Sequence, residues 1–275
     1  MEMKNFASFL WCVLLILQSS LGSHGQEIYA KTSRNDPNNV VKPKQHRDDP
    51  TLSVFFKVND LYLGKKMPIY FATNDKSNRA YLLSQQEVDS IPFSSKKLPY
   101  LLKFFSISNT SPQAEAMKTT LNLCEHKPKE DEFKFCVTSL ESMLNMTREI
   151  FGLVKPKVLT TKIFNSNHTL FQWYTFVEKP VEIYNLSKMV ACHAKAYPYL
   201  VYYCHGQKGH LTNRVFKIAL GGENGERVEA VAICHMDTST WDPEHVAFRV
   251  LGGRPGGFPV CHFLPADNLV WVASS

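Results

Sequence analysis

The sequence predicts an α+β fold in which a helical N-terminal half of the domain is followed by a mostly antiparallel β-sheet half, with disulfides stabilising both. Three observations predict this. Apolar residues recur at helical spacing over 84–152, whereas from residue 157 onward short β-branched and aromatic runs alternate with glycine-rich turns. The N-terminal segment is typical of secreted chains, so the cysteines that follow it are expected to form disulfides. The apolar content of 44% is enough for a sizeable core, which excludes a disordered protein.

The N-terminal region is predicted to be a leader and an arm rather than part of the domain. Lys4 precedes an apolar run over 6–17 that is shorter than a membrane span, and small residues follow it. We therefore predict a signal peptide at 1–25 and entry into the secretory pathway, with an uncleaved anchor as the alternative. Residues 26–50 are polar, charged and broken by proline, so we expect a flexible arm before a domain at 51–275. We expect no integral membrane segment in the mature chain.

Within the domain, each element has its own signal. The first strands, rich in aromatic and β-branched residues, are predicted at 53–58 and 67–71. Apolar spacings of three, four and seven predict helices at 99–105, 112–124 and 133–151. The second helix is expected to start at Ser111-Pro112, because proline is favoured at the first helical position. Further strands, separated by turn signals, are predicted at 158–163, 170–177, 200–203, 215–220, 228–233 and 246–250.

Four of the seven cysteines are followed directly by histidine, and these pairs all lie in the last third of the chain. The pairs are Cys192-His193, Cys204-His205, Cys234-His235 and Cys261-His262. They are separated by 10, 28 and 25 residues, and Trp271 follows the last pair after 8 more. Because both residue types are scarce, chance does not explain the pattern, and 192–262 is the most specific region of the sequence.

This spacing resembles the BURP domain, a plant family defined by four Cys-His pairs followed by a tryptophan. The residues around the pairs, at 197–206, 234–241 and 259–271, agree with the resemblance. Upstream, Phe135-Cys136 and Phe55-Phe56 also agree. The resemblance covers roughly residues 49–275 and is greatest to the short seed- and embryo-type members of the family.

Secretion decides the expected state of the cysteines. Cys12 lies in the predicted signal peptide, which leaves Cys124, Cys136, Cys192, Cys204, Cys234 and Cys261. An even number in an oxidising compartment indicates three disulfides, whose connectivity the sequence does not determine. We expect Cys124 to pair with Cys136, because both precede the repeated motif, and the motif cysteines to pair among themselves. A zinc site of thiolates is the alternative, and secretion argues against it because it needs reduced cysteines.

The histidines of the four pairs are candidate metal ligands. Neighbouring side chains on a strand point to opposite faces, so disulfides on one face would hold the imidazoles in a cluster on the other. Imidazole without free thiolate suits copper, zinc or nickel, and copper(II) leads the affinity order. The candidates are His193, His205, His235 and His262, with His126, His210 and His245 as weaker ones. The alternative is that each histidine only hydrogen-bonds a neighbour.

The resemblance implies a function only in outline. It implies a secreted, non-catalytic protein of seed or embryo development or of stress response, located in the protein storage vacuole or the cell wall (apoplast). Some BURP proteins are similar to copper-dependent peptide cyclases, which crosslink a tyrosine or tryptophan side chain of a peptide substrate. On this alternative the four histidines bind copper and Asp237 assists proton transfer. The arm offers one poor candidate for a core peptide, around Tyr29.

Composition and motifs limit the remaining alternatives. The formal charge of +6 favours polyanions, so a protein that binds cell-wall pectin or a polysaccharide hydrolase is a further reading. No basic helix, finger or aromatic-basic platform indicates nucleic acid, and no hydrolase or phosphate-loop motif occurs. Sequons for N-glycosylation predict modified surface positions at Asn109, Asn145, Asn167 and Asn185.

Overall fold

A computed structural model of the chain describes residues 52–71, 81–128, 130–164, 171–184, 186–208 and 212–274. The predicted signal peptide and arm lie outside the described residues, and so do His210, Asn167 and Asn185. Across the described ranges, no helix combines the length and the apolar character that a membrane crossing requires.

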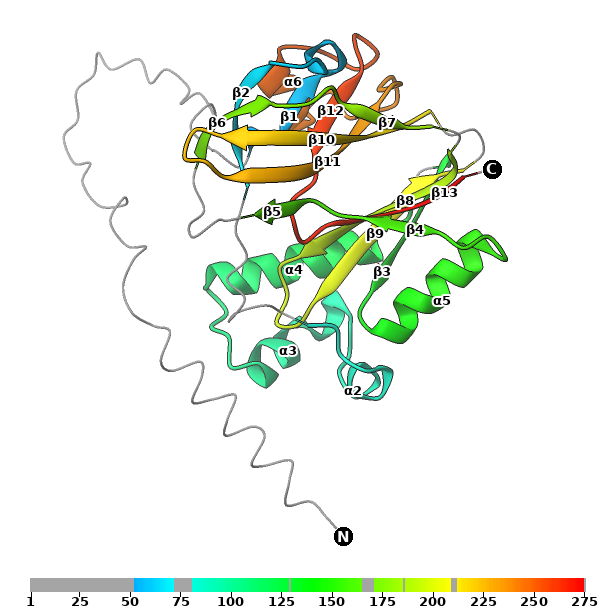
Figure 1. Cartoon of the computed structure of the whole chain (residues 1–275). Helices are drawn as coiled ribbons and strands as arrows, with labels where there is room; N and C mark the ends of the chain where they lie inside the picture. The colour runs from blue at the N-terminus through cyan, green and yellow to red at the C-terminus, as the bar shows by residue number, and fades with distance from the viewer. Residues whose placement is uncertain are drawn as a thin grey trace, which may run out of the picture. The chain divides into compact units, whose positions relative to one another are not determined.

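Two antiparallel sheets make up most of the described domain (Figure 1). The strands of the first sheet are β1 (Phe55–Lys57), β2 (Lys66–Tyr70), β5 (Lys162–Phe164), β6 (Phe171–Phe176), β7 (Val181–Ile183), β10 (Arg214–Gly222), β11 (Arg227–His235) and β12 (Val260–Phe263). Their order is β1-β12-β11-β10-β6-β2, with β5 paired to β11 and β7 to β10. The strands of the second sheet, in spatial order, are β3 (Glu132–Val137), β9 (Val201–Gln207), β8 (Leu186–Lys195), β13 (Leu269–Ser274) and β4 (Lys157–Leu159).

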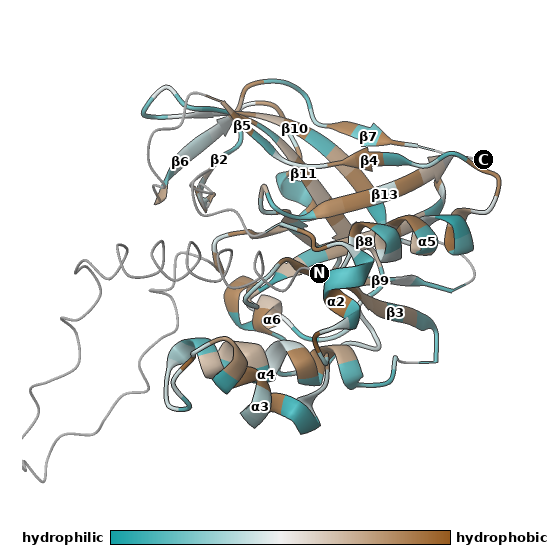
Figure 2. Ribbon diagram, turned by 90° about the horizontal axis from the view of Figure 1, so that it is seen from below, coloured by the Kyte–Doolittle hydropathy of each residue, from teal (hydrophilic) through white to brown (hydrophobic). Residues whose placement is uncertain are grey.

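The longer helices lie along the second sheet, while one short helix lies beside the first (Figure 1). The α-helices of the described residues are α2 (Gln85–Asp89), α3 (Leu98–Phe104), α4 (Pro112–Glu125), α5 (Leu140–Phe151) and α6 (Val246–Leu251). Helix α4 starts where the sequence predicts, because the Ser111 hydroxyl accepts the N–H of Ala114 and Pro112 occupies the first turn. Helix α5 mixes hydrophilic and hydrophobic residues around its axis (Figure 2) and buries Met143, Met146 and Phe151.

The predicted order of helices first and strands second is not supported, because strands dominate and the first half of the domain contributes to both sheets. Strands β1 and β2 join the first sheet, and β3 joins the second. Residues 133–137, predicted to begin a helix, instead pair with β9 over their whole length. Their apolar spacing fits a helix, but cross-strand hydrogen bonds and packing decide the outcome here.

The segment 246–250 is a second correction, since it was predicted to be a strand and forms α6. Its β-branched residues suggested a strand, but both ends of the segment carry helix-end chemistry. The His245 side chain accepts the N–H of Ala247 at the start, and Gly252 adopts a left-handed conformation after the end. The helix buries Ala247 and Phe248, and this tertiary contact outweighs the strand preference.

Three of the six clusters of buried side chains in the described domain lie against the sheets. One lies on one face of the first sheet and contains Cys234 and Cys261 among aromatic and aliphatic residues. A second lies between the second sheet and α5 and contains Cys192 and Cys204. The third joins the two sheets, with Ile233 of β11 among its members. Both Cys-His strand pairs therefore separate a cysteine-containing core from the space between the sheets.

Candidate functional site

The motif cysteines form two cross-strand disulfides with the same geometry. Cys192 on β8 lies directly opposite Cys204 on β9, and Cys234 on β11 lies directly opposite Cys261 on β12. Each facing pair is bonded, with Cα atoms 4.0 Å and 3.9 Å apart. The expected Cys124–Cys136 disulfide is also present, and it joins α4 to β3. All six cysteines of the domain are thus in disulfides, which excludes a zinc site of thiolates in this state.

The histidines occupy the opposite faces of the same strands, because each follows its cysteine by one residue. On β8 and β9, His193 lies opposite Tyr203 while His205 lies opposite Ala191, so that the two imidazoles are diagonal neighbours. Their Nε2 atoms are 3.3 Å apart. We call Cys192, His193, Cys204 and His205 the first half-site.

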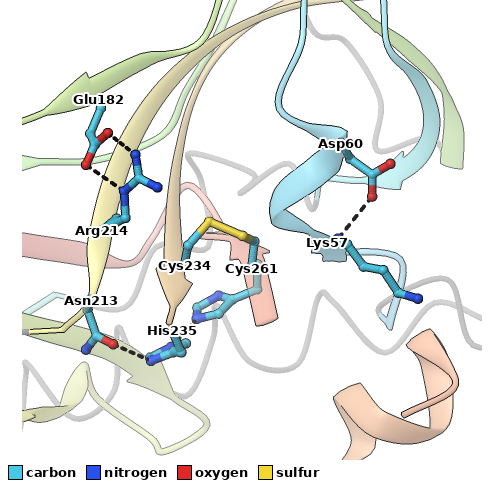
Figure 3. Close-up of a disulfide and its surroundings, with 9 residues drawn as sticks. Lys57, Asp60, Glu182, Asn213, Arg214, Cys234, His235 and Cys261 are labelled. Carbon is cyan, nitrogen blue, oxygen red and sulfur yellow. Dashed lines mark hydrogen bonds and ion pairs between the residues drawn. A yellow bond between two sulfur atoms is a disulfide. The ribbon is translucent and has the colours of Figure 1, made fainter. Parts of the chain in front are cut away.

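The second half-site, which consists of Cys234, His235, Cys261 and His262, repeats this arrangement on β11 and β12. His235 lies opposite Val260 and His262 lies opposite Ile233, which again makes the two imidazoles diagonal neighbours. Their Nε2 atoms are also 3.3 Å apart. Figure 3 shows the Cys234–Cys261 disulfide with His235 beside it. Two strand pairs in different sheets therefore present the same pair of imidazole nitrogens.

The two half-sites lie next to each other, because the His193 and His262 rings have centroids 6.4 Å apart. All four histidines are partly exposed, whereas all four cysteines are buried. Within the described part of the chain, no group of three or more His, Cys, Asp or Glu side chains is close enough to hold a metal ion as it stands. The structure thus brings all four predicted histidines together as two adjacent pairs.

A second layer of groups holds each imidazole through its Nδ1 atom. Glu132 contacts Nδ1 of His205 at 3.0 Å, and Asn213 contacts Nδ1 of His235 at 3.0 Å (Figure 3). The backbone carbonyl of Phe263 lies 3.2 Å from Nδ1 of His262, and the side-chain amide of Asn268 lies 2.9 Å from Nδ1 of His193. These contacts leave every Nε2 atom directed at a neighbouring imidazole. Outer partners of this kind orient histidine ligands in metal sites.

The surroundings of His193, His235 and His262 favour the neutral imidazole. Burial and the neighbouring imidazoles lower the pKa of His193 and of His235 well below the ordinary histidine value. Burial lowers the pKa of His262 to about 4. A neutral imidazole is the form that binds a metal ion, so these three histidines are in a binding form at neutral pH.

Aromatic rings line both half-sites. The Tyr203 ring stacks on His205 with centroids 5.4 Å apart, and Trp241 packs edge-on against His235 at 4.9 Å. His245, a weaker candidate, lies 4.5 Å from Trp241 and caps α6, so the structure places it beside the cluster in a structural role.

The other candidate residues have separate environments. His126 contacts the carbonyl of Asn122 at the end of α4. Asp237 is exposed and its carboxylate accepts the N–H of Ser239 within a turn. Asn109 and Asn145 are exposed, as glycosylation would require.

Sequence reasoning did not identify the outer partners Glu132 and Asn213. Glu132 precedes the Phe135-Cys136 stretch by a few residues, and Asn213 precedes a predicted strand. Neither position has a local signal, because each reaches its histidine only through strand pairing. Asn268 and Trp241 lie within the stretches 259–271 and 234–241 that agree with the family resemblance, but the sequence gives neither a role beside a histidine.

Comparison with known proteins is consistent with this motif. The BURP domain model matches residues 54–273. The chain belongs to the BURP domain family. It is 50% identical to the BURP domain protein USPL1 of Arabidopsis thaliana, over 82% of this chain and 81% of that protein. It is 48% identical to the BURP domain-containing protein BNM2C of Brassica napus, over 82% of each chain, and 39% identical to the BURP domain protein RD22 of Arabidopsis thaliana, over 86% of this chain and 59% of that protein.

Proposed function

We propose that this BURP-domain protein is secreted and binds a copper ion at its histidine cluster, as a metal-binding protein without catalytic activity. The observation that carries this is the repeated pair of Nε2 atoms, 3.3 Å apart in each half-site. Two nitrogens that each bind an ion at about 2.0–2.1 Å lie no more than about 4 Å apart. The spacing of the two Nε2 atoms within each half-site is therefore compatible with binding to a common ion.

The donor set fits copper by its chemistry. The residues that would hold the ion are His193, His205, His235 and His262. The cysteines are locked in disulfides and cannot supply thiolate, so the ligands are imidazoles, which suit copper(II). When bound, copper supplies one-electron redox chemistry. The protein residues contribute rigid placement, because each histidine stands next to a buried disulfide and has a partner at Nδ1.

Calorimetric titration of the secreted, disulfide-bonded protein with copper(II) tests this function. The double variant His235→Ala/His262→Ala is expected to lose at least about 100-fold in affinity. It removes two ligands, whereas the loss of one hydrogen-bonding partner behind a ligand already lowers metal affinity by about 10–100-fold. His126→Ala is the matched control, since that histidine lies at the end of α4. Equal affinity for the double variant and the control would contradict the proposal.

The family resemblance supports a proposal for the biological setting. We place the protein in the protein storage vacuole or cell wall, in seed or embryo development or stress response. The support is the similarity to USPL1 and BNM2C over four-fifths of each chain. A fluorescent fusion of the full chain, compared with one that lacks residues 1–25, tests delivery. Retention of the full chain in the cytosol would exclude this setting.

A copper-dependent peptide cyclase is the second candidate, and the partial exposure of all four histidines favours it. An ion held there would be accessible to a peptide side chain, and Tyr203 and Trp241 would offer aromatic walls. Mass mapping of the mature protein after incubation with copper(II), then full reduction and alkylation, tests self-modification. A Tyr29 peptide that lacks two hydrogens would support the cyclase, and an unmodified mass would exclude self-cyclisation.

A further inference from the structure

A groove of about 400 Å³ opens where strands of the two sheets meet, and none of the four motif histidines lines it. Residues 217–219 of β10 and 229–231 of β11 form its floor. The end of β4 forms one side and the segment that leads into β7 forms the other, and Figure 2 shows these two strands running next to each other. A groove of this volume is in the size range of small-molecule sites.

The strand register explains what the floor presents. Residues that lie opposite one another on paired strands share a face of the sheet, and Val181, Lys217 and Val231 are aligned in this way on β7, β10 and β11. The neighbouring row on the same face is apolar and packs between the two sheets; it consists of Ile183, Val215 and Ile233. Lys217 therefore lies between two valines at the point where the core between the sheets gives way to the groove.

The charges in the groove are only partly balanced. Three lysines and two glutamates line it, which leaves a formal charge of +1: Lys162, Lys179, Lys217, Glu178 and Glu229. Lys162 and Glu229 form an exposed ion pair at 3.8 Å, and Glu178 is adjacent in sequence to Lys179. Lys217, by contrast, has valines opposite it on both neighbouring strands, where an opposite charge would stabilise it. Its exposed ammonium is thus the cation that a bound anion can meet on the floor.

The remaining lining is mostly aliphatic. Val158 at the end of β4 and Val181 on β7 are 46% and 57% exposed, so the two sides of the groove present apolar surface to solvent. Among the described residues, those that line the groove include no aromatic ring; the other aliphatic members are Leu159, Ile218, Ala219, Ala230 and Val231. A ligand that covers this surface gains from burial of its own apolar part, and an aliphatic chain suits walls without rings.

We infer that this groove binds an aliphatic monocarboxylate, whose carboxylate pairs with the Lys217 ammonium. Its chain packs on Val158, Val181 and Val231. A single carboxylate balances the formal charge of +1 and leaves the existing ion pair on β5 and β11 intact. This inference goes beyond the proposed function, because it concerns a different surface and needs no metal ion.

Nuclear magnetic resonance of the full secreted protein with ¹³C-labelled valine methyl groups, titrated with hexanoate in the absence of metal, tests the site. We expect the methyl signals of Val158, Val181 and Val231 to shift together. 1-Hexanol, which has the chain without the charge, should bind about three- to fivefold more weakly, the range of an exposed ion pair. Acetate, which has the charge without the chain, should bind at least about tenfold more weakly.

Two matched substitutions identify the cation. Lys217→Met keeps an unbranched apolar side chain and removes the charge, so it should weaken hexanoate binding by about three- to fivefold and leave 1-hexanol binding unchanged. Lys103→Met removes the same charge from α3, outside the groove, and should change neither. Both lysines are exposed, and circular dichroism checks that each variant is folded.

The titrations separate the possible results. Hexanoate shifts confined to the groove, with a loss specific to Lys217→Met, would support the inference. Absence of these shifts, equal affinity for hexanoate and 1-hexanol, or equal losses in the two lysine variants would overturn it. Because every titration is made without metal, none of these results depends on whether the histidine cluster binds copper.

Discussion

The two half-sites use the same covalent pattern on equivalent strand pairs, yet they differ in the groups that contact the Nδ1 atoms of their histidines. Each has facing cysteines in a buried disulfide, diagonal histidines and an Nε2 separation of 3.3 Å. The first half-site is bounded by Asn268 and Glu132, and the second by Asn213 and a backbone carbonyl. The comparison teaches that a repeated motif sets where imidazoles lie, while the neighbouring residues set which groups contact their Nδ1 atoms.

Removal of one disulfide at a time is expected to have the largest effect. The loop closed by Cys234–Cys261 has a sequence separation of 27, and that closed by Cys192–Cys204 has 12. By chain entropy, Cys234→Ala/Cys261→Ala should lower the free energy of unfolding by about 3.5 kcal/mol, and Cys192→Ala/Cys204→Ala by about 3 kcal/mol. Denaturant unfolding of each variant measures this. A larger loss in the first half-site would show that packing around β8 and β9 outweighs loop length.

Single histidine substitutions sharpen the comparison at the level of binding. His262→Ala and His193→Ala should each weaken copper(II) binding by at least about 10-fold, because each removes one imidazole ligand from its half-site and even the loss of a partner behind a ligand costs about 10–100-fold. Calorimetry provides the affinities, and circular dichroism of each variant confirms that it is folded. A loss at one position and wild-type affinity at the other would show that only one half-site contributes ligands, and would contradict a site held by all four histidines.

A smaller effect concerns the ion pair that supports the second half-site. Arg214 lies opposite Cys234 in the strand register. Its guanidinium group forms a bidentate ion pair with the Glu182 carboxylate, in which Nε and Nη2 each donate to one oxygen. These hydrogen bonds lower the pKa of Glu182 below its ordinary value. The pair therefore stabilises the folded protein above the unfolded glutamate pKa of about 4.3, and this stabilisation is lost as pH falls through the lowered pKa.

Glu182→Gln should cost about 1 kcal/mol at neutral pH, because the Arg214 side chain is 40% exposed and solvent screens the pair. The difference from wild type should disappear in acid, below the lowered pKa. Unfolding free energies measured across this pH range provide the test, with the exposed Glu178→Gln as control. A difference that persists unchanged into acid would show that the ion pair is not its cause.

The smallest perturbation reports which half-site the ion enters. Trp241 packs against His235, whereas Trp173 is half-exposed on β6. Copper(II) at the second half-site should quench Trp241 emission, so Trp241→Phe should remove most of the quenching and Trp173→Phe little of it. Fluorescence titration measures both, and both variants should remain near wild type in copper affinity. Quenching that survives Trp241→Phe would place the ion away from His235.

Several elements could be read directly from the sequence. Ser111-Pro112 predicted the start of α4, and the alternation of cysteine and histidine on strands predicted sulfur on one face and imidazole on the other. Local chemistry suffices in these cases, because a helix cap and the two-residue period of a strand involve only near neighbours. Strand β3 and helix α6 were predicted incorrectly, because pairing with β9 in one case and burial of Phe248 in the other outweigh local preference.

The sequence by itself determined the family and pointed to the four histidines of the cluster, because the spacing of the Cys-His pairs is specific and each pair lies on a strand. The Cys124–Cys136 pairing was an expectation that the structure confirms. Only the tertiary structure decided that the histidines form two pairs, and that Asn268, Glu132 and Asn213 reach them. The physical reason is distance along the chain. Glu132 and His205 are 73 residues apart, and Asn268 and His193 are 75 apart, so these contacts exist only once the sheets have assembled.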